Sequence, residues 1–195
     1  MEKLYSLNRL KLTMGIFAIV LCFLSTALYS QRVVQVEPGL YTLTEAISAD
    51  TLPDGSRVDS NTVYELERGD NKIYILNGEI SNIGYHLTIR AEAGDGKRPY
   101  LVPGVPAGGE SSAPLRPKGD VTLKGLHITN RDINGKINER AIRCSADDIR
   151  VDVDDCWINE SSQSCFRLDN PGIKIYVKIQ SSAILAILMT RIMEE

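Results

Sequence analysis

The segment Val121-Thr-Leu123-Lys-Gly-Leu126-His-Ile128 is followed 30 residues later by Val151-Asp-Val153-Asp-Asp-Cys156-Trp-Ile158, with apolar residues at the same four positions. Ile175-Tyr-Val177-Lys178 begins the pattern again, 24 residues after Val151. Each repeat alternates apolar and polar residues with the period of a β-strand, turns, and resumes an apolar strand. One such unit cannot bury its own apolar face, so neighbouring units must stack. The repeat therefore predicts an all-β fold, a parallel β-helix or solenoid.

Other repeat folds fit the sequence less well. Leucine-rich and helical repeats are disfavoured, because the chain has no long segment with a 3.6-residue period and no leucine ladder. A two-sheet β-sandwich, which is also built from short strands, is the competing architecture.

The segment before the repeats predicts further short strands. Apolar and polar residues alternate over four to six positions between turn-forming residues. The predicted strands are Arg32–Val36, which stops at Pro38-Gly39, and then Asn61–Leu66, Lys72–Leu76 and His86–Arg90.

Two segments depart from the strand pattern. Leu43–Ala49 predicts a short helix of two turns in an N-terminal cap, with Thr42 or Thr44 as its capping residue. Pro99–Gly119 is rich in Pro, Gly and Ser and predicts a surface loop.

The composition bounds the class of protein. The chain has 195 residues, of which 43% are hydrophobic and 24% charged, and its formal net charge is −3. The length suits one domain or a part of one, and the apolar content argues against a disordered chain. Without an excess of positive charge, nucleic acid is not an expected partner.

Residues 1–30 have the layout of a signal peptide. Three basic residues within Met1–Thr13 precede the uncharged apolar run Met14–Leu24 and a short stretch of small and polar residues. Cleavage is expected after Ala27 or just before Gln31. An uncleaved anchor is the alternative, although the apolar run is short for a membrane span. The mature chain is therefore expected to be secreted or held at the cell surface, without a stable membrane span.

Residues 35–178 resemble the N-terminal part of a secreted, right-handed parallel β-helix protein of the pectate-lyase-like superfamily, and we predict its N-terminal cap and first coils over residues 31–178. That superfamily includes chondroitinase-B-like polysaccharide lyases and uncharacterised bacterial surface proteins. The resemblance implies a right-handed coil, export and an acidic polysaccharide as partner, and it assigns no catalytic residue. The motifs that carry it are EPGLYTLTEAI (37–47), YILNGEI (74–80), HLTIRAEAGDGKRPYL (86–101), DVTLKGLHITN (120–130) and DIRVDVDDCWIN (148–159).

The tail at 179–195 breaks the pattern. It loses alternation, Gly and Asn together, and its apolar core is too short to span a membrane. An amphipathic terminal helix is one interpretation. The neighbouring reading frame, with ordinary codon choices, would instead complete the third repeat. We therefore expect an aberrant, frameshifted tail and a parent protein that continues with further coils.

Five aspartates lie between positions 147 and 155, and clustered carboxylates are typical ligands of calcium. Asp152, Asp154 and Asp155 are weak candidates for a metal site. The repeat favours another role, because Lys124, Asp154 and Lys178 share one position in three repeats. Neighbouring strands would place these opposite charges about 4.8 Å apart. We expect a charge-paired, solvated face with no metal or other cofactor, and calcium is left as an option for the full-length parent.

A polysaccharide lyase needs a base near the C5 proton of the sugar and a cation that neutralises the uronate carboxylate. The arginines Arg140, Arg143, Arg150 and Arg167 could supply such cations, but no sequence feature brings them together. Catalytic residues are therefore left unassigned.

His86, His127 and Trp157 lie in strand segments. We expect structural roles for the two histidines, and for Trp157 a place in the core or against a turn rather than against a sugar. An exported chain could pair two of its cysteines, but the apolar neighbours of all three favour buried free thiols: Cys144, Cys156 and Cys165.

Two functions follow as hypotheses. The first is a carbohydrate-associated β-helix related to polysaccharide lyases, with its active coils beyond residue 178. The second is a non-catalytic, adhesin-like surface β-helix. In either case we expect the chain as written to be an inactive N-terminal fragment whose open apolar end is prone to edge pairing.

Overall fold

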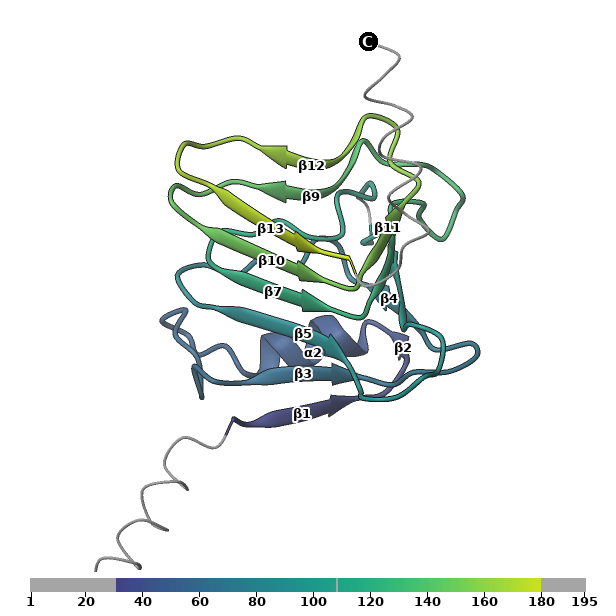
Figure 1. The fold of residues 1–195 in the computed structure, drawn as a ribbon, viewed down its shortest axis with the longest axis horizontal. Helices are drawn as coiled ribbons and strands as arrows, with labels where there is room; N and C mark the ends of the chain where they lie inside the picture. Colours follow the sequence, from purple (N-terminus) through teal and green to yellow (C-terminus); the bar gives the residue numbers. More distant parts are fainter. Residues whose placement is uncertain (1–30, 108, 180–195) are drawn as a thin grey trace, which may run out of the picture. The chain divides into compact units, whose positions relative to one another are not determined.

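The computed structural model describes residues 31–107 and 109–179. Within them, short strands wind around three faces and stack as a right-handed parallel β-helix of about five turns (Figure 1). The first face, sheet A, holds β1 (Val33–Val36), β3 (Val63–Leu66), β5 (Leu87–Ala91), β7 (Val121–Lys124), β10 (Arg150–Asp154) and β13 (Lys174–Lys178). The second face, sheet B, holds β2 (Gly39–Leu40), β4 (Ile73–Leu76), β6 (Tyr100–Pro103), β8 (His127–Thr129) and β11 (Trp157–Asn159).

The third face is shorter. It consists of β9 (Arg140–Cys144) and β12 (Ser164–Leu168), and parallel bridges from Ile80 to Leu115 and from Leu115 to Ile142 extend it. One coil therefore runs through sheet A, sheet B and the third face. We number the coils from the strand of sheet A that begins them, so that β1, β3, β5, β7 and β10 open coils 1 to 5.

The register confirms the repeat read from the sequence. Val151 pairs with Val121 on one side and with Ile175 on the other, and Trp157 pairs with His127. The strand ladders of the described residues are all parallel, which excludes the two-sheet sandwich.

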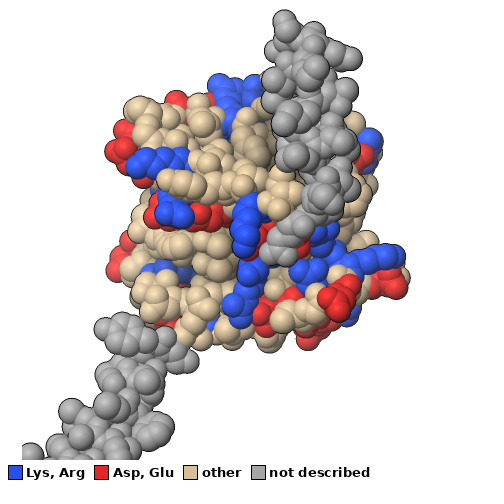
Figure 2. Space-filling view, viewed as in Figure 1, with Lys and Arg blue, Asp and Glu red and all other residues tan. Residues whose placement is uncertain are grey.

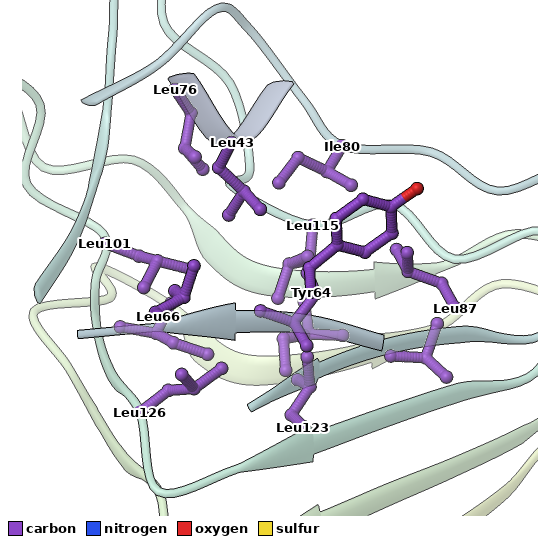
Figure 3. Packing of buried hydrophobic residues seen from close by; sticks show 14 of the residues in the cluster. Leu43, Tyr64, Leu66, Leu76, Ile80, Leu87, Leu101, Leu115, Leu123 and Leu126 are labelled. Atoms are coloured by element: carbon purple, nitrogen blue, oxygen red, sulfur yellow. The ribbon is translucent and has the colours of Figure 1, made fainter. Parts of the chain in front are cut away.

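The core is built from apolar side chains that point inward from all three faces and stack in rows from coil to coil (Figure 3). Sheet B, for example, contributes Tyr74, Leu101 and Ile128 from coils 2, 3 and 4. Leu101 pairs in register with Tyr74 on one side and with Ile128 on the other, and all three are fully buried. Burying one such side chain contributes roughly 1.5–3 kcal/mol, so stacked coils stabilise what one coil could not. One row in sheet A is Tyr64, Ile89, Leu123 and Val153, and a second is Leu87, Val121 and Val151. The row of the third face is Ile80, Leu115, Ile142 and Phe166.

The helix α2 (Thr42–Ala49) contacts β1, β3 and β4 and buries Leu43 and Ile47, one turn apart, in the core. The predicted threonine cap is wrong. Tyr41 precedes the helix in a left-handed conformation, with φ at 67°, and no side chain caps it. Thr42 instead donates a hydrogen bond to the Glu37 carbonyl at 2.7 Å, because its hydroxyl closes the turn that leads into the helix.

The prediction of a surface loop over Pro99–Gly119 is also wrong in part. The segment begins with β6, whose Leu101 is completely buried, and Leu115 is buried later in the same segment. The segment is rich in proline and glycine, but β6 pairs with β4 of the preceding coil and with β8 of the following coil. Pairing with the neighbouring coils therefore makes this part of the segment a strand, although its local composition is typical of a loop.

The outer surface of sheet A carries a column of charged side chains, as the repeat predicts. Lys124 Nζ lies 3.6 Å from Asp154 Oδ2, and Lys178 Nζ lies 3.9 Å from Asp154 Oδ1. Below them, Arg90 Nε lies 2.7 Å from Glu65 Oε2. Lys and Arg atoms gather with Asp and Glu atoms at the end of sheet A to which the arrows of Figure 1 point (Figure 2).

The predicted signal peptide at 1–30 and all but Ile179 of the predicted aberrant tail lie outside the described residues. Of the helices that the structure describes, none is long and apolar enough to cross a bilayer.

Candidate functional site

The third face carries a row of arginines on successive coils. Arg143 in β9 pairs in register with Arg167 in β12. Leu115 bridges to Ile142, so the following residues, Arg116 and Arg143, also lie side by side on neighbouring coils. Parallel neighbours are separated by about 4.8 Å, and we call Arg116, Arg143 and Arg167 the arginine row.

Carboxylates orient the three guanidinium groups. Arg116 donates to Glu79 Oε1 at 3.2 Å, and Arg143 Nε donates to Asp169 Oδ2 at 2.6 Å. Arg167 bonds the other oxygen of Asp169. The hydrogen bond from Arg143 lowers the pKa of Asp169, and the same contact raises the pKa of Arg143. The row holds three guanidinium groups against two carboxylates, those of Glu79 and Asp169, and so it carries an excess of positive charge.

A cavity of about 320 Å³ lies beside the row and is lined by Arg140 and Arg143. Arg140, at the start of β9, contacts Glu139 and Gln163. The opposite wall includes Ser111, whose buried hydroxyl donates to Asp132 Oδ2 at 2.6 Å and lies 2.9 Å from Asn138 Oδ1. A buried polar network thus fixes the loop that borders the arginines.

The structure brings together three of the four arginines that the sequence singled out. Arg140, Arg143 and Arg167 lie on the third face, whereas Arg150 lies on sheet A. There it bonds Asp152 at 2.7 and 2.8 Å, and its guanidinium carbon lies 4.4 Å from the centre of the Tyr176 ring. Arg116 belongs to the row but escaped the sequence reasoning, because it lies in the segment interpreted as a loop.

The three weak metal candidates point to different partners. Asp152 is paired with Arg150, and Asp154 lies between Lys124 and Lys178. Asp155 accepts a hydrogen bond of 2.6 Å from Arg98. Residues 31–107 and 109–179 hold no group of three or more His, Cys, Asp and Glu side chains arranged to bind a metal ion.

Three aromatic residues of sheet B, Tyr100, His127 and Trp157, lie side by side on its outer surface. His127 stacks on Trp157 with ring centres 4.4 Å apart and planes 6° apart, and Tyr100 lies 4.4 Å from His127 on the other side. The prediction that Trp157 packs in the core or against a turn is wrong, because 51% of the residue is exposed. Ile158 points inward, and strand alternation therefore turns Trp157 outward. His86 directly precedes β5 of sheet A, and its Nε2 is 2.9 Å from Thr122 Oγ1 of β7.

The cysteines of the described residues are free, and they do not form a disulfide. Cys144 is buried, whereas Cys156 and Cys165 are partly buried. Burial raises the pKa of Cys144 and of Cys156 to about 11. These two thiols therefore behave as small apolar groups, as expected from their neighbours.

The arginine row can bind anions but offers no base. Planar guanidinium groups form paired hydrogen bonds with carboxylate and sulfate oxygens. Arginine is effectively always protonated, so the row itself cannot abstract a proton. Comparison with protein-family models, with curated proteins and with solved structures found no match for this chain.

Proposed function

We propose that this protein is an exported β-helix that binds an acidic polysaccharide along the arginine row of its third face. The observation that carries the proposal is the register that places Arg116, Arg143 and Arg167 on three successive coils. The sequence resemblance to the pectate-lyase-like superfamily and the signal-like residues 1–30 support the same proposal.

The row suits a polymer better than a single small anion. Its cations repeat at about 4.8 Å along the solenoid, so a chain with regularly spaced carboxylates can contact several coils at once. The side chains of Arg143 and Arg167 are 38% and 42% exposed, and their partner Asp169 serves both of them. A uronate carboxylate can therefore share the outer edge of each guanidinium without displacing Asp169.

Binding can be tested by electrophoresis of the full chain through gels that contain polygalacturonate, with neutral dextran gels as the reference. We expect retardation in polygalacturonate only, and weaker retardation at high salt, because exposed charges are screened. Arg143→Gln and Arg167→Gln should each weaken retardation. Arg150→Gln is the matched control, because it removes the same charge from sheet A, at an arginine that is 55% exposed and also paired with an aspartate.

Equal loss of retardation in Arg150→Gln and Arg143→Gln would show a response to net charge and would refute binding at the row. Lyase and adhesin-like roles are then separated by incubating the protein with the polymer and following the ultraviolet absorbance of unsaturated uronates. An increase with time supports a lyase, and retardation without such an increase supports a non-catalytic binding surface.

A further inference from the structure

A second cluster of cations lies at the corner where sheet A turns into sheet B, remote in the coil from the third face. A cavity of about 470 Å³ is lined there by residues of four successive coils. The lining side chains include four cations and two carboxylates: Arg68, Lys97, Arg98 and Lys124, with Asp95 and Asp155. The pocket therefore carries a net positive charge, although the whole chain is acidic.

Arg68 is the fixed cation of this corner pocket. Its Nε donates to the Glu92 carbonyl at 2.8 Å, and Nη1 donates to the Gly96 carbonyl at 3.2 Å. Within the described part of the chain, no carboxylate oxygen forms an ion pair with this guanidinium. Backbone carbonyls orient Arg68 but leave its full charge available to a ligand.

Glycine makes room for this arrangement. Gly125 has a φ of +68°, and a Cβ at that position would lie 2.5 Å from Arg68 Nη2. A side chain at position 125 would therefore push the guanidinium out of the pocket as well as strain the backbone.

Of the remaining cations, Arg98 is held in place by hydrogen bonds, whereas Lys97 and Lys124 are exposed and can change conformation. Arg98 is held by Asp155 through hydrogen bonds of 2.9 Å to the carbonyl and 2.6 Å to Oδ1. Lys97 pairs with Asp70 at 2.6 Å, but their side chains are 80% and 74% exposed. Lys124 is 57% exposed and lies 3.6 Å from Asp154. Exposed pairs of this kind contribute little, so both amines can turn to a ligand at small cost.

An apolar strip adjoins the corner pocket. Ile73, Tyr100, His127 and Trp157 share one register position on β4, β6, β8 and β11 and border a second cavity of about 430 Å³. Lys97 and Arg98 line both cavities, so the two lie next to each other. Burial lowers the pKa of His127, although the hydrogen bond that its Nε2 donates to Asn159 Oδ1 opposes the shift, and the strip is therefore uncharged at neutral pH.

We infer that the corner pocket binds a sulfate or phosphate ester through Arg68, Lys97 and Lys124, with the ring that carries the ester lying on the apolar strip. Three cations from different coils line this one cavity, and a tetrahedral oxyanion has enough oxygens to accept hydrogen bonds from all three. The strip adds an apolar surface beside it, and a ring with one apolar face complements that surface. The inference goes beyond the proposed polysaccharide function and does not depend on it.

Trp157 is the only tryptophan of the chain, so its fluorescence reports on the strip. The full chain is titrated with glucose 6-sulfate and glucose 6-phosphate, with inorganic sulfate and phosphate as competitors, and with glucose as the neutral control. We expect a saturable fluorescence change with the esters, none with glucose, and competition by the inorganic anions. The ester with the lower Kd identifies the source of the oxyanion.

Arg68→Gln should weaken ester binding about 10-fold, the loss of one charge-assisted hydrogen bond. Lys124→Gln should weaken it by a smaller factor. Lys178→Gln is the matched control, because Lys178 flanks the same Asp154 but lies outside the pocket. Should Arg68→Gln fail to fold, Lys97→Gln, at an exposed position, takes its place. Absence of saturation with both esters, or equal weakening in Lys124→Gln and Lys178→Gln, overturns the inference.

Discussion

The charged column on sheet A gives a quantitative test of the coil register. Asp154 has a lysine on each side, Lys124 and Lys178, and Lys124 also has Arg90 as its other neighbour in register. The native column from Arg90 to Lys178 thus contains one repulsive and two attractive contacts between coils. Each such contact changes the free energy of unfolding by about 0.2–0.5 kcal/mol, since the lysines are 57% and 73% exposed and screened by solvent.

Substitution Asp154→Lys turns both attractive contacts into repulsive ones. Four increments of that size predict a loss of roughly 1–2 kcal/mol in the free energy of unfolding. Substitution Lys124→Asp makes the contact with Arg90 attractive and the contact with Asp154 repulsive. The numbers of attractive and repulsive contacts therefore stay the same. We expect it to leave stability nearly unchanged. The double variant has two attractive contacts and one repulsive contact again, and it should recover nearly the native stability.

Equilibrium unfolding in urea measures these differences as shifts of the midpoint at constant slope. At about 1 M NaCl, where the Debye length is about 3 Å, the deficit of Asp154→Lys should shrink by more than half. A double variant as unstable as Asp154→Lys alone would refute the register, because positions 124 and 154 would not be neighbours. A deficit that salt leaves unchanged would instead show that packing, and not charge, causes it.

Three further outcomes are expected. Leu123 is fully buried in sheet A, so Leu123→Ala should lower the free energy of unfolding by about 2–5 kcal/mol in urea titrations. Leu40 is 57% exposed, and Leu40→Ala should lower it far less. Similar losses in the two variants would contradict the core assignment. Burial lowers the pKa of His127, so the unfolded chain binds more protons, and stability should fall as the pH drops through about 6.5. A His127→Gln variant whose melting temperature shows the same dependence on pH would argue against this cause. Cys144 and Cys156 have pKa values of about 11, so their thiols should react slowly with iodoacetamide at about pH 8 until urea unfolds the chain. Mass spectrometry follows the labelling. Rapid labelling of either thiol in the folded protein would count against its burial.

Much of the strand register could be predicted from the repeat alone. Val121, Val151 and Ile175 were aligned by their apolar neighbours, and the structure pairs them in that alignment. The reason is physical. In a parallel stack, residues at the same position of successive repeats become neighbours, so the contact between Lys124 and Asp154 follows from the alignment.

The orientation of Trp157 could also have been predicted. Ile158 occupies the inward position of β11, and the period of two then places Trp157 on the outer surface. At this position the alternation of the strand outweighs the general tendency of tryptophan to be buried.

The sequence by itself determined that this chain stacks short parallel strands, and which residues of sheet A and sheet B pair between coils 4 and 5. Only the tertiary structure decided which side chains meet from different loops: Arg116 with Arg143 and Arg167 on the third face, and Arg68 with Lys124 at the corner. Alternation fixes the side of a residue within one strand, but the turns between faces differ in length from coil to coil. The register across such turns therefore cannot be found by counting residues. It is set by the apolar residues that each coil buries on either side of the turn.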